Sequence, residues 1–170
     1  MNKTSKDIKI INHIGKNVKL GRNVKLWHFT YIGDSTIIGD NAIIGSLTHI
    51  DYKVKIGNDC RIEGSVYIPP LTIIGNGVFI GPGVIFTNDP YPPSKRLSGI
   101  IVEDGAVIGA GSIIKSGTRI GKNSVVAMGA LVTNDVNSDT VVMGTPAKPV
   151  YLRTEYEKKR KNWEKNMIID

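Results

Sequence analysis

The chain is poor in the residues that mark secreted and membrane proteins. A single cysteine among 170 residues excludes an intrachain disulfide framework and fits a cytosolic setting. No apolar run approaches the roughly 20 residues that span a bilayer, and the opening residues, MNKTSKDIKI, lack the apolar core of a secretory signal. These absences lead us to expect a soluble, cytoplasmic protein with no membrane partner.

Aromatic side chains are also scarce. The chain has 3 phenylalanines and 2 tryptophans against 19 glycines, a balance that suits many tight turns around an aliphatic interior. Its length allows one domain with a real core. The formal net charge of +7 favours anionic partners such as phosphates or nucleic acid, although charge alone does not indicate a fold.

What the sequence does contain is a six-residue repeat. Residues i and i−2 face the same side of a strand, so a large apolar residue with a small or β-branched residue two positions earlier predicts a short strand facing a core. The large residues are Ile8, Ile14, Leu20, Leu26, Ile32, Ile38, Ile44, Ile50, Ile56, Ile62, Ile68, Ile74, Ile80 and Phe86, then Val102, Ile108, Ile114, Ile120, Val126 and Val132. Cys60 stands in the small column, so we expect a packed core thiol.

Each hexad also carries turn-forming residues. Glycine often follows the large residue, with Asn or Asp after it, as in Asp40-Asn41; we expect these residues to supply the positive φ that turns the chain. Strands this short cannot bury an inner face alone, but stacking them builds a continuous core. The predicted class is an all-β solenoid, and a helix is excluded because six residues are not a multiple of 3.6.

The repeat breaks once, at FTNDPYPPSKRLSG, residues 86–99. A solenoid wall accepts an insertion only at a corner, where a loop leaves without disturbing the stack, and three prolines reduce the entropy lost when this loop orders. We expect the loop at 87–100 to form one wall of a substrate site, with Asn88, Asp89 and Tyr91 binding the substrate. The alternative is an excursion without function.

The stretch GAVIGAGSIIKSGTRIGKNSVVAMGALVTNDV, followed by VVMGTPAKPV, resembles the acyl-CoA-binding half of the hexapeptide-repeat acyltransferases. The likeness extends over residues 8–150. It implies a left-handed parallel β-helix domain over 1–150, with eighteen residues and three strands per coil, followed by a C-terminal helix over 151–170. It also implies a homotrimer in which acyl-CoA lies in a groove between neighbouring subunits.

Two further segments, NVKLWHFTYIG and FIGPGVIFTND, are most similar to one branch of that family. Its members acetylate an amino group on a nucleotide-linked sugar, such as a UDP-linked amino-sugar uronate or a dTDP-linked aminodeoxyhexose. The resemblance therefore implies an N-acyltransferase that uses acetyl-CoA and such a sugar. Sugar O-acetyltransferases are the alternative, but they keep a catalytic His where this chain has Asn88.

Residues eighteen apart should stack in columns outside the coil. One column holds His13, Tyr31, His49 and Tyr67; another holds His28, Ser46, Gly64 and Pro82, with Glu63 beside it. N-acylation needs a route for the amine's proton, and histidine suits that task near neutral pH. The resemblance implies larger polar side chains, an acid or amide and then an Asn, at the positions that Ser46 and Gly64 occupy here. We therefore expect His49, then His28 and Glu63, to act in catalysis. Alternatively, the CoA sulfur takes the proton, or the histidines pack at a subunit interface.

The resemblance also places the cofactor. It implies that the outward backbone around Ala110, Gly111, Met128 and Gly129 binds the pantetheine arm, because small residues there allow close approach. Lys148, in GTPAKPV, matches a basic family position near the nucleotide phosphates; the alternative is a solvated lysine.

The tail, TEYEKKRKNWEKN, predicts a helix with Thr154 as its N-cap. One helical face would cover the open end of the solenoid and its strand edges; that face holds Leu152, Tyr156, Trp163 and Met167. The basic run at 158–161 could bind nucleic acid, but basic residues beside glutamates are more typical of a solvated face. No nucleic-acid partner is expected.

Two other functions share this scaffold. A γ-type carbonic anhydrase holds zinc between subunits, and His13 and His49, two coils apart, suit part of such a site. The residue five after His49, however, is Val54, where that pattern needs another His; two ligands do not complete a catalytic zinc site, so no metal is expected. The other alternative is a non-catalytic assembly solenoid, which the CoA-like half argues against.

Overall fold

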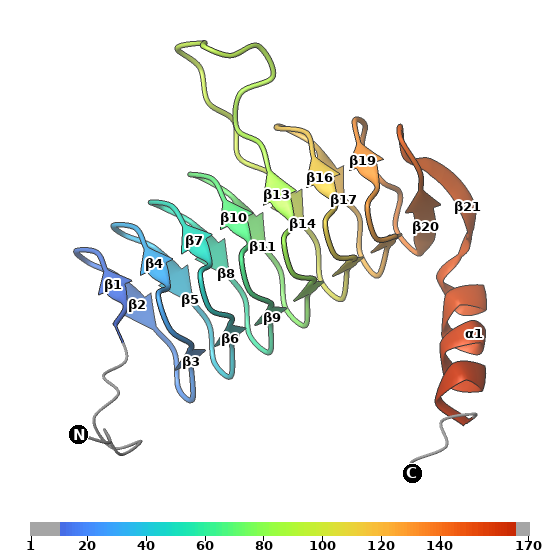
Figure 1. The fold of residues 1–170 in the computed structure, drawn as a ribbon, viewed down its shortest axis with the longest axis horizontal. Helices are drawn as coiled ribbons and strands as arrows, with labels where there is room; N and C mark the ends of the chain where they lie inside the picture. Colours follow the sequence, from blue (N-terminus) through green and yellow to red (C-terminus); the bar gives the residue numbers. More distant parts are fainter. Residues whose placement is uncertain (1–10, 166–170) are drawn as a thin grey trace, which may run out of the picture.

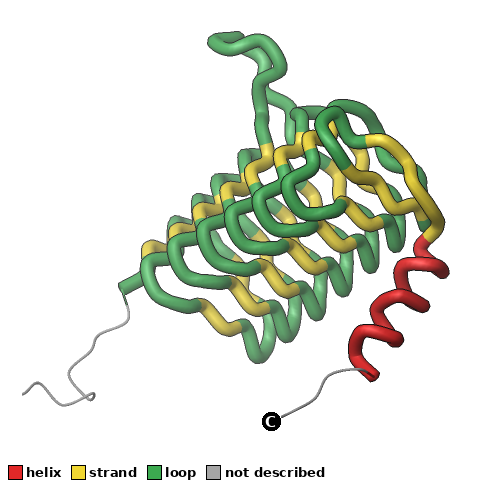
Figure 2. Tube along the Cα trace, turned by 45° about the vertical axis from the view of Figure 1, so that its right-hand side comes forward, coloured by secondary structure: helices red, strands yellow, loops and turns green. Residues whose placement is uncertain are grey.

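Two-residue strands follow one another every six residues around a three-sided coil. In the computed structural model, which describes residues 11–165, each strand from β1 to β20 pairs in parallel with the strand one coil away. Figure 1 shows the coils side by side along the long axis, with β1 and α1 at opposite ends, and Figure 2 shows the strands gathered on the faces. The predicted parallel β-solenoid with a C-terminal helix is confirmed.

The strands form three sheets, called here the first, second and third faces. The first face contains β1 (His13–Ile14), β4 (Tyr31–Ile32), β7 (His49–Ile50), β10 (Tyr67–Ile68), β13 (Ile85–Phe86), β16 (Ile113–Ile114) and β19 (Leu131–Val132). The second contains β2 (Lys19–Leu20), β5 (Ile37–Ile38), β8 (Lys55–Ile56), β11 (Ile73–Ile74), β14 (Ile101–Val102) and β17 (Arg119–Ile120). The third contains β3 (Lys25–Leu26), β6 (Ile43–Ile44), β9 (Arg61–Ile62), β12 (Phe79–Ile80), β15 (Val107–Ile108), β18 (Val125–Val126), β20 (Thr140–Met143) and β21 (Lys148–Leu152).

The turn after each face is named after that face. The second corner comprises residues 21–24, 39–42, 57–60, 75–78, 103–106 and 121–124. The third corner comprises residues 27–30, 45–48, 63–66, 81–84, 109–112 and 127–130. Each corner therefore runs as one line along the length of the solenoid.

The core is the double column of inward residues. From Ile32 to Val132 every predicted large residue is buried, and so are the small partners between them. Ile14 and Leu20 are exposed at the N-terminal end, and Ile8 lies outside the described residues. The Cys60 thiol is buried and donates to the carbonyl oxygen of Gly75 at 3.0 Å, and burial raises its pKa. The predicted core thiol is confirmed.

The turns differ from expectation in the role of one glycine. Positive φ falls three residues after the large inward residue, where Asn41 and Asp59 do supply it but side chains as large as Phe29 (φ 59°) and Leu47 (φ 62°) also occur. The glycine directly after the large residue is instead required by the next coil, since a Cβ on Gly45 would lie 2.4 Å from a backbone nitrogen. The prediction that this glycine turns the chain is wrong.

The C-terminal end is closed by a hairpin and a helix. β20 extends the third face in parallel, and β21 pairs with β20 in the antiparallel sense, with a bulge between Val141 and Val142. The helix α1 (Arg153–Lys165) follows directly. Arg153 fastens it to the second corner, because its guanidinium donates to the carbonyl oxygen of Asn123 at 3.1 Å.

The helix departs from two expectations. It begins at Arg153, so Thr154 lies inside its first turn and is not the N-cap. None of its described residues is buried, and Trp163 is 75% exposed, so the predicted apolar face does not cover the end of this protomer; Met167 lies outside the described residues. In the described part of the chain, no helix has the length and apolar character needed to cross a membrane.

Candidate active site

The structure distributes the predicted site residues over three places. His28, Glu63, Ala110, Gly111, Met128 and Gly129 all lie on the third corner. His49 lies on the first face, in β7, and Asn88, Asp89 and Tyr91 lie on the loop that leaves the first corner (Figure 1). Lys148 begins β21 at the C-terminal end. One protomer thus places Glu63 and the cofactor residues other than Lys148 on one line, while the loop projects away from the solenoid at the first corner (Figure 1).

His49 is held in a ladder of rings. Its ring stacks on Tyr31 with centroids 4.4 Å apart and planes 12° apart, Tyr31 stacks on His13 at 4.6 Å, and Tyr67 lies 5.6 Å from His49 on the other side. Burial, followed by the nearby Asp51, raises the pKa of Tyr67. The predicted column is therefore real, and His49 remains exposed at its edge.

The third corner leaves backbone amides without protein acceptors. On the second corner, the N–H of the second turn residue donates to a side-chain oxygen one coil on: Asp40 to Asn58 and Asn58 to Asn76, each at 2.8 Å. On the third corner the same position holds Ser46, Gly64, Pro82, Ala110 and Met128. Within residues 11–165 the N–H groups of Ala110 and Met128 have no acceptor, and both residues are exposed.

The neighbouring glycines do not share this property. The N–H of Gly111 donates to the carbonyl oxygen of Pro82 at 2.9 Å, and that of Gly129 donates to Ala110 at 2.8 Å. These two amides are therefore occupied by the stacking of coils. The two glycines leave space for a ligand because they have no side chain, and a Cβ on either one would meet nothing within 4 Å.

Lys148 lies beside a small cavity of about 140 Å³ at the C-terminal end. Asn134, Asp135 and Ala147 also line this cavity, and Lys148 itself is exposed. The lysine is about two inter-strand spacings, roughly 10 Å, beyond the coil of Met128, because β20 adds to the third face next to β18 and β21 adds next to β20. It can reach an anion at this end of the third corner.

The loop uses part of its predicted chemistry on itself. The Asp89 carboxylate accepts the backbone N–H of Tyr91 at 2.8 Å and that of Ser94 at 2.6 Å, and these hydrogen bonds, Ser94 first, lower the pKa of Asp89. Asp89 thus shapes the loop. Tyr91 is 82% exposed and, with Arg96 and Ser116, lines a cavity of about 410 Å³ at the base of the loop.

Sequence reasoning missed one group of residues. A groove of about 420 Å³ on the third face is lined by Lys25, Trp27, Ser46, Arg61, Glu63 and Gly64 among others. Lys25 and Arg61 are thirty-six residues apart, so the coil length alone could have placed them together. Lys25 lies within the segment NVKLWHFTYIG, but no motif connected it with Arg61. In the described residues, no group of three or more His, Cys, Asp or Glu side chains is placed to hold a metal ion.

Family models match most of the repeat. The model described as bacterial transferase hexapeptide (six repeats) matches residues 17–52, 35–70 and 53–88, and that of the hexapeptide repeat of succinyl-transferase matches residues 99–134. The chain belongs to the hexapeptide-repeat transferases. The unmatched gap coincides with the projecting loop.

Individual proteins are similar over parts of the chain. The 2,3,4,5-tetrahydropyridine-2,6-dicarboxylate N-acetyltransferase of Shouchella clausii is 56% identical over 70 residues, which are 41% of this chain and 28% of that protein. The chain spans about a third or less of the length of the curated relatives it matches.

Two solved structures share the fold. WeeI from Acinetobacter baumannii AYE is 26% identical with a TM-score of 0.57, over 79% of this chain and 55% of that one. PerB from Caulobacter crescentus, solved with CoA and GDP-perosamine, is 24% identical with a TM-score of 0.53, and the match covers 84% of this chain and 58% of that one. The second likeness indicates the fold alone.

Proposed function

We propose that this hexapeptide-repeat transferase is a CoA-dependent N-acetyltransferase that works as a cytoplasmic homotrimer. The observation that carries the proposal is the line of unpaired, exposed amides on the third corner at Ala110 and Met128. An extended pantetheine arm has amide oxygens that accept such donors. The name of the Shouchella clausii relative, an N-acetyltransferase, supports the same chemistry.

The acceptor we propose is the amino group of a nucleotide-linked sugar. The segments NVKLWHFTYIG and FIGPGVIFTND support this choice. In a trimer, the loop carrying Asn88 and Tyr91 would cover the third corner of the neighbouring subunit, where the thioester lies. Asp89 would act by holding that loop in shape, through the two amides that it accepts.

The reaction needs few protein groups. The neutral amine attacks the thioester carbonyl, the C–N bond forms, and the C–S bond breaks as the CoA thiolate leaves. The amine loses one proton, which passes to His49, with His28 and Glu63 as further candidates, or directly to the departing sulfur. Backbone N–H groups of the third corner would stabilise the oxyanion, and Lys148 would pair with the CoA phosphates.

The test is thiol release from acetyl-CoA with a panel of amines. UDP-, dTDP- and GDP-linked amino sugars form one arm, and tetrahydropyridine dicarboxylate, the substrate in the name of the relatives, forms the other. Turnover with an amino sugar supports the proposal. Turnover with the dicarboxylate alone would show that the acceptor is the dicarboxylate and not a nucleotide-linked sugar. Absence of both turnover and acetyl-CoA binding would overturn the function itself.

A pair of variants tests His49. His49→Ala should lower kcat at least about 100-fold, the range of a lost proton-transfer group, and leave acetyl-CoA affinity unchanged. His49→Phe keeps a ring between Tyr31 and Tyr67 without a titrating nitrogen. If His49→Phe turns over like the parent protein while His49→Ala does not, the histidine serves the ladder and the proton leaves by another route.

A further inference from the structure

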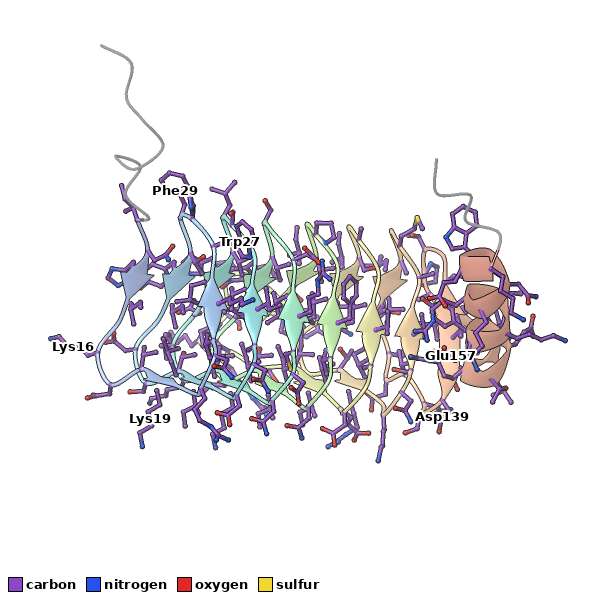
Figure 3. The ribbon with its side chains drawn as sticks, turned by 90° about the horizontal axis from the view of Figure 1, so that it is seen from below. Lys16, Lys19, Trp27, Phe29, Asp139 and Glu157 are labelled. Carbon is purple, nitrogen blue, oxygen red and sulfur yellow. The ribbon has the colours of Figure 1, made fainter. Side chains whose placement is uncertain are left out.

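The groove on the third face has the elements of an anion site with an aromatic wall. The Trp27 side chain is 57% exposed, and Figure 3 shows it near the N-terminal end, on the side opposite Lys19. An exposed indole offers a flat surface on which a nucleobase can stack. Lys25 and Arg61, from β3 and β9, line the same groove and are exposed.

One carboxylate, Glu63, orients Arg61, and the groove keeps a positive charge because Lys25 is also present. Arg61 Nε donates to Glu63 Oε1 at 2.5 Å, and within residues 11–165 the two terminal guanidinium nitrogens have no acceptor. With Lys25, Arg61 and Glu63, the groove has one net positive charge. A guanidinium whose Nε is anchored presents its other donors to phosphate in a fixed direction.

A backbone donor opens into the same groove. On the second corner, the N–H equivalent to that of Ser46 is accepted by a side-chain oxygen eighteen residues on. The residue eighteen after Ser46 is Gly64, which has no side chain, and the Ser46 N–H has no acceptor among the described residues. The missing side chain leaves both an open space and an unpaired donor at the floor of the groove.

We infer that this groove binds a nucleoside diphosphate, with the base on Trp27 and the phosphates on Lys25, Arg61 and the Ser46 amide. The volume of about 420 Å³ lies in the range of small-molecule sites. Glu63 has a second oxygen left to accept a hydroxyl of the ligand. The inference rests on the proposed function, because the nucleotide it assigns here is the one attached to the amino sugar.

The position of the groove fits that assignment. Ser46 and Ala110 lie on the same corner, three coils apart, or about 14 Å at the spacing of paired strands. A nucleotide held at Ser46 and a pantetheine arm held at Ala110 therefore approach each other along one line. The sugar and the thioester would meet between them, near Gly64 and Pro82.

Tryptophan fluorescence provides a direct test. The chain has 2 tryptophans, and Trp163 lies on α1 at the other end of the solenoid. In Trp163→Phe, where Trp27 is the remaining tryptophan, UDP, GDP or dTDP should quench the emission at saturation, and in Trp27→Phe, which keeps Trp163, the emission should not respond to these nucleotides. A saturable nucleotide signal that persists in Trp27→Phe would contradict the site.

Calorimetry then measures the contribution of each group. Trp27→Ala should lower the affinity for the nucleotide at least about tenfold. Arg61→Ala should lower this affinity and reduce its dependence on salt. Lys55→Ala, an exposed lysine at the same strand position on the second face, is the matched control and should change nothing. Equal affinities in all four proteins would overturn the inference.

Acetyl-CoA separates the possible sources of the diphosphate. If the groove serves the acceptor, Trp27→Ala leaves acetyl-CoA affinity unchanged. If UDP, GDP and dTDP do not bind and Trp27→Ala weakens acetyl-CoA, the groove holds the nucleotide end of the cofactor and the assignment is wrong. Acetyl-CoA turnover with no nucleotide bound in the groove would defeat this inference while leaving the N-acetyltransferase proposal intact.

Discussion

The second and third corners have the same turn, but the backbone N–H of the second turn residue has a side-chain acceptor only on the second corner. On the second corner, Asp40, Asn58 and Asn76 each accept the N–H of the residue one coil before them, at 2.8 Å. On the third, Gly64, Ala110 and Met128 carry no side-chain oxygen, and their corner keeps unpaired donors at the surface. The solenoid therefore does not need the side-chain ladder to form its coils, and a corner without one is available to a ligand.

The largest effect should come from a feature that both corners share. A Cβ on Gly109 would lie 2.4 Å from the nitrogen of Met128, a backbone atom that cannot move aside, so Gly109→Ala should lower the free energy of unfolding by about 3 kcal/mol. Gly111→Ala is the matched control: its φ is +66° with nothing within 4 Å, so only about 1 kcal/mol is expected. Urea unfolding measures the free energy of unfolding of both variants. Equal losses would show that the backbone shifts to relieve the contact between the Gly109 Cβ and the Met128 nitrogen.

Giving the third corner the chemistry of the second should break its function. In Met128→Asp, a carboxylate takes the place that Asn58 and Asn76 have on the second corner and can accept the Ala110 N–H. Acetyl-CoA affinity should fall about 100-fold, or about 2.7 kcal/mol, because the donor is occupied and the new charge repels phosphate. Met128→Leu keeps the donor unpaired and should bind like the parent protein in calorimetry. Unchanged affinity in Met128→Asp would move the pantetheine arm away from Ala110.

The opposite change, removing an acceptor from the second corner, should affect stability and not binding. Asn58→Ala leaves the Asp40 N–H without its 2.8 Å partner, which should lower the free energy of unfolding by about 1 kcal/mol. Ser46→Ala, at the same turn position on the third corner, removes no acceptor in use and should stay within about 0.5 kcal/mol of the parent. Should both variants lose the same stability, the two corners would not differ in the way described.

The sequence predicts the features of this molecule that repeat. Period six predicts every buried column from Ile32 onward and the packed thiol of Cys60, since inward packing depends only on alternation along a strand. Period eighteen predicts the ring ladder of His49 with Tyr31 and Tyr67. Each of these patterns follows one local rule and recurs in many coils, so its repetition excludes a chance match.

Features that depend on a single three-dimensional contact were harder to predict. The glycine after each large residue is required by the next coil, a contact with no local signature, as Gly45 shows. Asp89 accepts amides of its own loop, and Thr154 lies inside a helix that begins where β21 ends. The groove of Trp27 and Arg61 combines residues from separate coils, and no motif connects the two, so only the stacking of the coils brings them together.

The smallest effect we predict concerns acid stability of the second corner. The pKa of Asp40 is lowered by the Arg22 backbone N–H and then by the Arg22 guanidinium, and the pKa of Glu103 is lowered by Arg119 and then by the Lys122 N–H. A pKa that is lower in the folded state means that the unfolded chain binds more protons. The resulting stabilisation is complete above the ordinary carboxyl values of 3.8 and 4.5 and is lost as the pH falls through the lower, folded values.

Asp40→Asn separates the charge from the hydrogen bond. The amide keeps an Oδ1 acceptor for the Arg22 N–H but does not titrate, so the fall of Tm with pH below about 5 should be shallower than in the parent protein. Arg22 is exposed and Asp40 is only partly buried, so the change in slope should be small and should shrink further in high salt. A slope identical to that of the parent protein would mean that the second corner is held by its neutral hydrogen bonds alone. The charge of Asp40 would then contribute nothing to the difference between the two corners.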